Sequence, residues 1–398
     1  MHSSVILVCR VFIKEAITMP EKKKRTLTAA QRARKAKLRR RRKIRRIAWR
    51  SVLTVLTIIV LLLAAVLSAG YAAFRGPSRT MGDLLTVSLL ETSALKFVPR
   101  IYYSEAEVQQ IVKRNQLASV EEETDTSLIV IAPPTPEPTP VPEDAEESPA
   151  IDMSALVTPV PTDAPIVDED GIKIYEVHGG TYNGYMMIVQ DPSRVSVGTS
   201  RDSFNSKPGL QLHQIAERYD AVAAINGGAF HDDGGGGNGG QPGGLVIADG
   251  KLLNKADKSA LRNIVVGFNE DDILIFGEFS GAQAKERNMR DCVTFGPVLV
   301  ANGEPVTVSG SGSGLNPRTA IGQRADGAVL MLVIDGRQAN SIGASYADLI
   351  KVMLDYDAVN AVNLDGGSSS MLYYQGEYLN NGVVLTGSRK LPTSFIVR

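Results

Sequence analysis

From about residue 166 to the C-terminus, short apolar runs of strand length alternate with turn-forming residues. Two segments in this region, 210–219 and 346–356, repeat apolar residues every three or four positions, as amphipathic helices do. Ser345 and Asp348 stand where the second helix would have its capping box. Many strands with few helices predict an α+β fold, a mixed β-sheet domain with a few packed helices. The predicted strands cover residues 185–189, 195–197, 221–225, 245–247, 264–268, 273–276, 298–300, 329–334, 359–364 and 395–397.

One long apolar stretch lies much closer to the N-terminus. Residues 52–69 contain no charged side chain, and residues 70–74 extend the stretch enough to cross about 30 Å of hydrocarbon. A cleaved signal peptide is the alternative, but its apolar region is about 7–15 residues long and ends at a small-residue cleavage site. We therefore predict a single transmembrane helix over residues 51–74 that acts as an uncleaved signal-anchor.

The charges are distributed unevenly, although the formal net charge is zero. Lysine and arginine are concentrated in residues 22–50, and acidic residues predominate after residue 50. The positive-inside rule then predicts a cytoplasmic N-terminus, with residues 1–50 as a basic head, and an extracytoplasmic C-terminal region. A basic run can also bind nucleic acid, but a run beside a membrane span favours contact with anionic lipid head groups. We expect a single-pass protein of the cell membrane with no nucleic-acid partner.

Two segments of different composition separate the predicted span from the globular region. Residues 75–132 show some helical periodicity, with Ser104 and Glu107 as a second predicted capping box, and we expect them to form a stalk. Residues 133–165 are rich in proline and acidic residues, which predicts an extended linker that holds the outer domain away from the membrane. Residues 166–398 are long enough to build their own core.

The two cysteines of the chain, Cys9 and Cys292, fall on opposite sides of the predicted membrane. No intrachain disulfide is therefore expected. Met19, followed by a proline and an acidic residue, is an alternative start of the protein to Met1.

Residues 360–370 carry the pattern that is most informative about function. An apolar strand leads into an aspartate, two glycines and three serines. Glycine allows a sharp turn and a close approach of ligand to backbone, and serine hydroxyls can bind a sugar or an anion. A plain hairpin turn is the alternative, but the turns at 302–303 and 326–327 carry no hydroxyl run. The predicted site residues of this segment are Asp365, Gly366, Gly367, Ser368 and Ser369.

Two other segments complete a set of three motifs. Asn226, Gly227 and Gly228 follow a predicted strand and precede a glycine-rich stretch, and Arg318 and Thr319 open another apolar strand. The three motifs, in this order, resemble the phosphodiester glycosidase family, whose animal member removes N-acetylglucosamine from a sugar phosphodiester. That family shows an Asn-Gly-Gly-aromatic-Phe, an Arg-Thr-Ala-Ile-Gly and a Leu-Asp-Gly-Gly-Gly-Ser segment, in that order.

The resemblance covers residues 170–398, with two departures from the family pattern. Ala229 stands where an aromatic residue is common, and Ser368 stands where the third glycine often lies. Both departures bear on substrate specificity rather than on membership.

The resemblance implies hydrolysis of a glycosyl phosphodiester, and each predicted role has an alternative. Arg318 would hold the phosphate with its guanidinium fork, or it is a surface arginine before a strand. Asp365 would be the base or nucleophile and Asp335, which ends another strand, the second carboxylate, or either acid only orients a loop. Asn226 and Asn238 would bind the sugar, or they only form turns.

A metal site is not expected. Asp232, Asp233 and Asn238 could form a calcium loop, but their spacing is not that of an EF-hand. The histidines are scattered, which argues against zinc. We expect no cofactor, with calcium as the one divalent cation to consider.

The sequence thus predicts a membrane-anchored extracytoplasmic hydrolase that cleaves a sugar-1-phosphodiester bond in cell-envelope polysaccharide or a glycoconjugate. A non-catalytic glycan-binding or exopolysaccharide-assembly module is the second hypothesis. A glycopolymer phosphotransferase is the third, but that class would usually need a metal and several arginines.

Overall fold

The structure is a computed structural model that describes residues 28–92, 95–120, 122–131, 164–204, 207–231, 237–255, 264–380 and 388–398. The chain divides into two compact units, Met1–Ala69 and Gly70–Arg398. Most of the predicted Pro-rich linker, the start of the basic head, Met19 and Cys9 lie outside the described residues.

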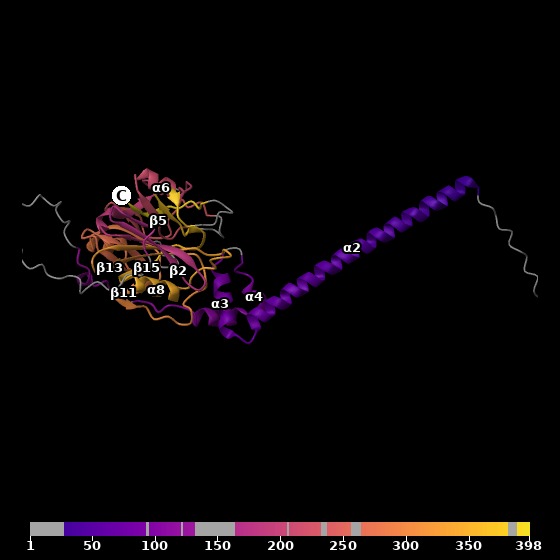
Figure 1. The fold of residues 1–398 in the computed structure, drawn as a ribbon, viewed down its shortest axis with the longest axis horizontal. Helices are drawn as coiled ribbons and strands as arrows, with labels where there is room; N and C mark the ends of the chain where they lie inside the picture. Colours follow the sequence, from indigo (N-terminus) through magenta and orange to yellow (C-terminus); the bar gives the residue numbers. More distant parts are fainter. Residues whose placement is uncertain are drawn as a thin grey trace, which may run out of the picture. The chain divides into compact units, whose positions relative to one another are not determined.

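Helix α2 (Ala29–Arg75) contains the predicted span of residues 51–74 and much of the basic head (Figure 1). It is long and apolar enough to cross a membrane, a criterion of length and composition that an anchor and a signal sequence both meet. Within the described residues no other helix meets this criterion.

The unit Gly70–Arg398 is built on three antiparallel sheets. The largest has the order β1 (Val167–Glu169), β2 (Ile172–His178), β3 (Asn183–Val189), β14 (Val329–Ile334), β13 (Arg318–Arg324), β15 (Ala358–Asn363), β11 (Val298–Ala301) and β12 (Glu304–Pro305). The second has the order β7 (Lys251–Asn254), β6 (Val246–Ala248), β10 (Met289–Thr294), β8 (Ile264–Asn269) and β9 (Leu274–Glu278). The third has the order β17 (Glu377–Tyr378), β16 (Leu372–Tyr374), β5 (Ala223–Asn226), β18 (Thr393–Val397) and β4 (Val195–Thr199).

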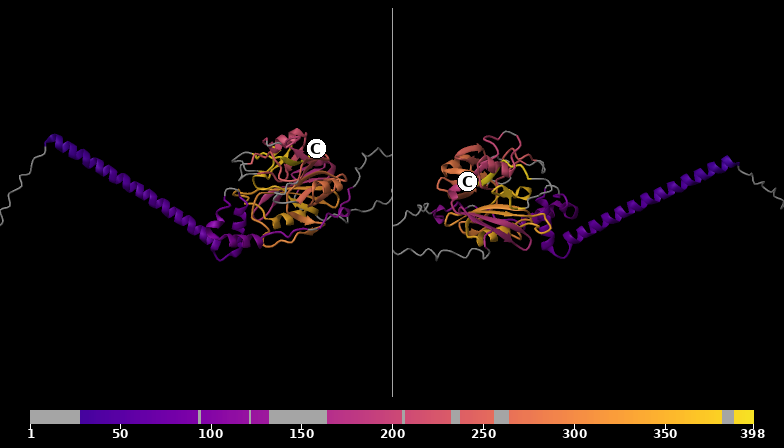
Figure 2. Two further views of the ribbon diagram at one scale, coloured as in Figure 1. Left: turned by 180° about the vertical axis from the view of Figure 1, so that it is seen from behind. Right: turned by 45° about the horizontal axis from the view of Figure 1, so that its top comes forward.

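The central core lies between these sheets, and helices cover outer faces. Val333 of β14 contributes to the central core, whereas Leu332 and Ile334 pack with α8 (Tyr346–Asp355) on the other face of the same strand. Helix α6 (Leu212–Arg218) packs on the third sheet, so that α6 and α8 lie on opposite sides of this unit (Figures 1 and 2). The short helix α7 (Gly281–Glu286) follows β9.

The α+β prediction is confirmed. Each of the ten predicted strands coincides with an observed strand, and both predicted helices are present as α6 and α8. The capping box of α8 is also present, because the Ser345 hydroxyl accepts from the Asp348 amide while the Asp348 carboxylate accepts from the Ser345 amide. Strands β1, β2, β7, β10, β12, β16 and β17 were not predicted, and β13 was expected only as the apolar strand that Arg318 opens.

The segment expected to be a stalk lies in the same compact unit as the sheets. It forms α3 (Arg79–Leu90), α4 (Pro99–Tyr102) and α5 (Glu105–Lys113), and the predicted Ser104–Glu107 capping box opens α5. After α5, the Ala118 amide donates to the Thr307 carbonyl at 2.9 Å and the Val130 amide to the Ala325 carbonyl at 2.8 Å.

These contacts change the expected role of the Pro-rich linker. Val130 is bonded to the sheets on one side of it, and on the other side the Ile166 amide donates to the Ile174 carbonyl at 2.8 Å. Because both ends of the linker are held by the same unit, residues 133–165 do not set the distance between the stalk helices and the sheets.

Candidate functional site

The three predicted motifs meet at one end of the central strands of the largest sheet. Strand β13 runs antiparallel to β14 and β15, with Arg318 opposite Ile334 and Ala320 opposite Asn363. The start of β13 therefore lies beside the ends of the two neighbouring strands, which lead into Asp335 and the loop of residues 364–371.

Asn226, a residue of the third sheet, is hydrogen-bonded to these strand ends. It ends β5 and is fully buried. Its Nδ2 donates to the backbone carbonyl of Asp365 at 2.6 Å, and its Oδ1 accepts from the Thr319 hydroxyl at 2.7 Å and the Met371 amide at 3.2 Å. Asn226, Thr319 and Asp365 are thus brought together, and the Asn226 amide group holds both ends of the loop that carries Asp365.

A second asparagine ties Asp335 to the same loop. Asp335 is buried, and its Oδ1 accepts from Asn380 Nδ2 at 3.0 Å. The same Nδ2 lies 3.0 Å from the Ser370 carbonyl, and Asn380 Oδ1 accepts from the Leu372 amide at 2.7 Å. Both predicted carboxylates therefore border one loop. Asn380 was not predicted, because an isolated asparagine outside a motif gives no sequence signal.

The serine run places hydroxyl groups inside this loop. Ser369 and Ser370 are buried, and in the part of the chain that the structure describes their hydroxyls have no hydrogen-bond partner. Buried polar atoms are nearly always hydrogen-bonded to protein, water or ligand. These two hydroxyls are therefore free to bind a polar ligand. Ser369 was among the predicted substrate-binding residues, and Ser370 was not.

Two guanidinium groups flank the glycine-serine part of the loop. Arg389 Nη1 donates to the Ser368 hydroxyl at 3.2 Å, and its guanidinium lies over the Phe230 ring at 4.7 Å from the centroid. A Cβ placed on Gly367, the preceding residue, would lie 3.4 Å from Arg337 Nη2. Arg389 was not predicted, because it lies outside the three motifs.

Arg337 also lies near the charged side chains of Arg318 and Glu91. Its Nη2 donates to Asn316 Oδ1 at 3.0 Å. Burial around its guanidinium group and the nearby charge of Arg318 both lower its pKa, while the Glu91 carboxylate raises it.

The side chain of Arg318 points away from Asn226, although Thr319 next to it points toward it. Successive residues of a strand face opposite sides of the sheet. Arg318 therefore lies on the α8 face, 4.4 Å from the centroid of the Tyr346 ring, and its Nη2 lies 2.7 Å from Glu91 Oε2. The remaining partners are the Ser313 hydroxyl and the carbonyls of Gly314 and Ala344.

Glu91, which follows α3, thus forms an ion pair with the arginine that we expected to hold a phosphate. Burial alone lowers the pKa of Arg318, but the negative charge of Glu91 and the contacts with Tyr346 outweigh it, so the pKa is raised. A substrate phosphate could reach this guanidinium only if Glu91 left it. The structure brings the backbone of Arg318 to the site and directs its side chain to the stalk helices.

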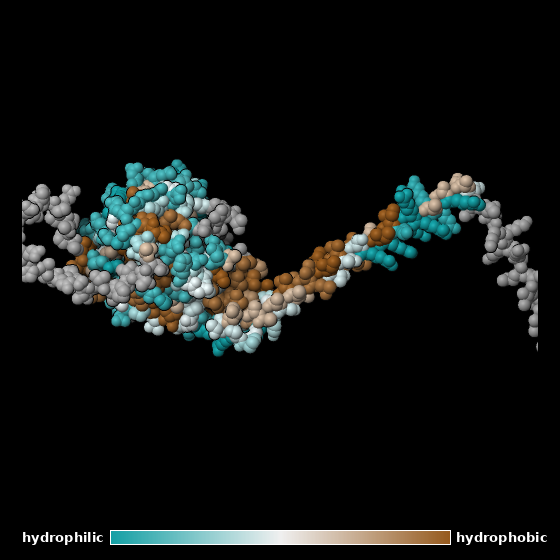
Figure 3. Space-filling view, viewed as in Figure 1, coloured by the Kyte–Doolittle hydropathy of each residue, from teal (hydrophilic) through white to brown (hydrophobic). Residues whose placement is uncertain are grey.

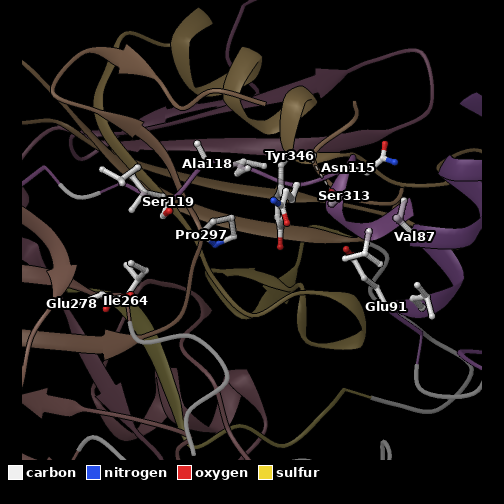
Figure 4. A pocket seen from close by; sticks show the side chains of 17 residues that line it. Val87, Glu91, Asn115, Ala118, Ser119, Ile264, Glu278, Pro297, Ser313 and Tyr346 are labelled. Atoms are coloured by element: carbon white, nitrogen blue, oxygen red, sulfur yellow. Dashed lines mark hydrogen bonds between the residues drawn. The ribbon is translucent and has the colours of Figure 1, made fainter. Parts of the chain in front are cut away.

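A cavity of about 790 Å³ adjoins this ion pair (Figure 4). Glu91, Ser313 and Tyr346, which all contact Arg318, form part of its lining together with apolar residues of α3 and the sheets such as Val87 and Val298. None of the predicted site residues is among its lining residues.

The glycines after Asn226 have a packing reason within the protein. A Cβ on Gly227 would lie 2.7 Å from the Thr393 hydroxyl, and one on Gly228 would lie 2.8 Å from the Thr294 carbonyl oxygen. The absence of a side chain at these glycines thus lets the backbone pass close to β18 and β10. We had predicted Gly227 and Gly228 as substrate-binding residues.

Asn238 lies apart from this hydrogen-bond network. Its Oδ1 accepts from the Gly240 amide at 2.9 Å and its carbonyl from the Gly209 amide at 2.9 Å, so it stabilises a turn. Asp232 and Asp233, the other members of the considered calcium loop, lie outside the described residues. Among the residues described, no group of three or more His, Cys, Asp or Glu side chains could hold a metal ion.

Comparison with known proteins supports the family resemblance. Residues 219–398 match the family model for phosphodiester glycosidase. An uncharacterized protein derived from the SPβ prophage of Bacillus subtilis is 32% identical over 194 residues, which cover 47% of this chain and 29% of the relative. The bovine N-acetylglucosamine-1-phosphodiester alpha-N-acetylglucosaminidase is 27% identical over 189 residues, which cover 43% of this chain and 34% of the enzyme. The matched regions thus span about a third of each curated relative.

Solved structures with a related arrangement also exist. The catalytic domain of the zebrafish N-acetylglucosamine-1-phosphodiester alpha-N-acetylglucosaminidase, described as auto-inhibited by its pro-peptide, matches 59% of this chain and 86% of that domain, with 21% identity and a TM-score of 0.47. A hypothetical protein from Synechocystis matches 57% of this chain and 62% of its own, with 16% identity and a TM-score of 0.46.

Proposed function

From the match of residues 219–398 to the phosphodiester glycosidase family, we propose that this protein hydrolyses the glycosyl–phosphate bond of a sugar-1-phosphodiester. The observation that carries the proposal is the loop of residues 364–371, which contains Asp365 and is held by two asparagines, one of which also bonds the Asp335 carboxylate. Asn226 holds the backbone of Asp365, and Asn380 links Asp335 to the same loop.

Two carboxylates beside one loop suit this reaction. With Asp365 as base, water gives it a proton and adds to the anomeric carbon as the bond from that carbon to the phosphate oxygen breaks. With Asp365 as nucleophile, its carboxylate displaces the phosphate first and water then hydrolyses the glycosyl–Asp365 bond. In both cases the electrons of the broken bond leave with the phosphate. The transition state resembles an oxocarbenium ion, which a carboxylate can stabilise or attack. Asp365 is the base or nucleophile and Asp335 the second carboxylate. Phosphate leaves readily, so the reaction requires less general-acid assistance than an ordinary glycoside does.

The negative charge of the phosphodiester needs a cation. Arg389 and Arg337 fit this role better than Arg318, because Arg318 is paired with Glu91. Arg389 contacts Ser368, and Arg337 lies against Gly367, so both guanidinium groups border the loop. A guanidinium remains charged and offers paired donors to phosphate oxygens. The Ser369 and Ser370 hydroxyls supply further polar contacts to the substrate.

The membrane-spanning role proposed for α2 determines on which side of the membrane the reaction would take place. Its apolar window would cross the membrane as an anchor, and the basic residues in its N-terminal half would remain in the cytoplasm. The unit of sheets is then extracytoplasmic, and the substrates within its reach are polysaccharides or glycoconjugates of the cell envelope.

The test is a turnover assay with the full-length protein in lipid vesicles. N-acetylglucosamine-1-phosphate methyl diester and a UDP-sugar serve as substrates, and free sugar is measured with and without an acceptor glycan. Release without acceptor is the expected result. Sugar phosphate joined to the acceptor, with release of methanol or UMP and no free sugar, would identify a phosphotransferase, and binding of both compounds without turnover would identify a glycan-binding module. Either of these two results overturns the proposal.

A further inference from the structure

Large apolar side chains are exposed in the segment between α3 and α5. Phe97 is 58% exposed, Ile101 53% and Leu95 46%; we call these three residues the apolar turn. Figure 3 shows apolar surface gathered over the region of α3 and α4. An exposed apolar cluster of this kind marks an interaction surface.

The three side chains belong to one run of helical turns. The Val98 amide donates to the Leu95 carbonyl at 2.9 Å, the Ile101 amide to the Val98 carbonyl at 3.0 Å, and the Arg100 amide to the Phe97 carbonyl at 3.1 Å. In such a run residues three or four apart are neighbours on the surface, so Phe97 and Ile101 form one ridge, and Leu95 precedes them in the first turn.

This turn is fixed against the last residues of the apolar helix. The rings of Phe74 and Tyr102 stack with centroids 4.7 Å apart, and Arg75 Nε donates to the Tyr102 carbonyl at 2.9 Å. Arg75 also bonds Glu107 of α5 at 2.8 Å. Tyr102 directly follows Ile101, so the apolar turn is held at the point where α2 ends.

Two basic side chains accompany the apolar turn. Lys96 lies within the turn, and Arg100 next to Ile101 keeps a half-exposed side chain in its ion pair with Glu105. Long basic side chains at a membrane surface can place their apolar stems in the interface and their charges among the head groups.

We propose that the apolar turn docks into the outer surface of the bilayer that α2 crosses, with Leu95, Phe97 and Ile101 at the boundary between head groups and acyl chains. The inference rests on the anchoring role given to α2 under the proposed function. A segment bonded to Phe74 and Arg75 must lie at the membrane surface if α2 spans it, and apolar side chains there enter the interface.

The test uses a single tryptophan as a depth probe. The chain has one tryptophan, Trp49, so Phe97→Trp in a Trp49→Phe background reports from the apolar turn alone. Leu252→Trp in the same background is the matched control, because Leu252 is 46% exposed and lies on β7. Full-length proteins are reconstituted in phosphatidylcholine–phosphatidylglycerol vesicles with and without brominated acyl chains. Thermal unfolding confirms that each variant is folded.

Brominated lipid is expected to reduce the Phe97→Trp emission at least about twofold and to leave the Leu252→Trp emission unchanged. Equal, weak quenching at both positions in a chain that resists carbonate extraction would overturn the docking alone. A blue-shifted but unquenched Phe97→Trp emission would also overturn it, since the ridge would then be covered by protein. Release of the whole chain by carbonate would overturn the anchoring role of α2 and the docking with it, while leaving the proposed hydrolysis intact.

Discussion

Glu91 Oε2 lies 2.7 Å from Arg318 Nη2, and this ion pair joins the stalk helices to the strand that borders the candidate site. Arg318 and Thr319 are neighbours in β13: the first holds Glu91 on one face of the sheet, and the second bonds Asn226 on the other. The segment after α3 and the loop that carries Asp365 are therefore connected through two consecutive residues of one strand.

Removing the negative charge of Glu91 is expected to destabilise the protein. Glu91→Gln leaves the buried Arg318 charge without its partner. Because the Glu91 side chain is 31% exposed, we expect the free energy of unfolding to fall by about 2 kcal/mol, less than for a fully buried pair. Glu105→Gln is the control, because Glu105 pairs with Arg100 at 2.8 Å with both side chains about half exposed. That change should cost less than about 1 kcal/mol. Denaturant unfolding measures both, and equal effects would contradict the structural role of the Glu91 pair.

Replacing the arginines beside the loop should affect turnover and stability separately. Arg389→Lys removes a bidentate donor from the substrate phosphate, so kcat/KM should fall by about tenfold or more while Tm changes little. Arg318→Lys should lower Tm instead, because Arg318 is buried among Glu91, Ser313 and Tyr346. If Arg318→Lys kept its Tm and lost turnover while Arg389→Lys remained active, the phosphate would bind at Arg318.

The close backbone packing after Asn226 predicts a cost for any side chain at Gly228. Gly228→Ala places a Cβ 2.8 Å from the Thr294 carbonyl oxygen, which should destabilise the fold by about 1–3 kcal/mol. At Gly180, a Cβ meets nothing within 4 Å, so Gly180→Ala should change stability by less than about 0.5 kcal/mol. A Gly228→Ala variant as stable as the wild type would show that this glycine serves another purpose.

The buried thiol of Cys292 should be unreactive in the folded protein. Burial raises the pKa of Cys292 to about 12, and the thiolate is the form that reacts with alkylating reagents. The folded state therefore retains the proton, and the stability this contributes falls as the pH rises above the unfolded thiol pKa of about 8.5. Iodoacetamide at pH 8 should label the Cys292 peptide only after unfolding, as mass spectrometry can measure. Rapid labelling of the native protein would contradict the burial.

The sequence predicted much of the fold because its strongest signals are local. Strand-length apolar runs, the capping boxes at Ser345 and Ser104, and the meeting of Asn226, Thr319 and Asp365 all appear in the structure. Strand β13 was expected only from the motif at Arg318, because its α8 face carries small residues, Ala320 and Gly322, and so shows no long apolar run.

What the sequence could not supply is the direction of side chains and the contacts between distant single residues. The direction of Arg318 depends on which face of β13 packs on α8, and no pattern within residues 316–322 determines this. Glu91, Asn380 and Arg389 reach the site region from segments without a motif, so only the folded chain shows their partners.

The rate of sugar release by Asp365→Asn tests the central claim most directly. Asn keeps the size of the side chain, and the backbone bonds of residue 365 to Asn226 and Gly227 remain. The control is Asp326→Asn, at an Asp-Gly turn whose aspartate is 57% exposed. We expect Asp365→Asn to lose at least about 100-fold in turnover at an unchanged Tm, with Asp326→Asn as active as the wild type. Wild-type turnover in a folded Asp365→Asn variant would contradict the assignment of the active site.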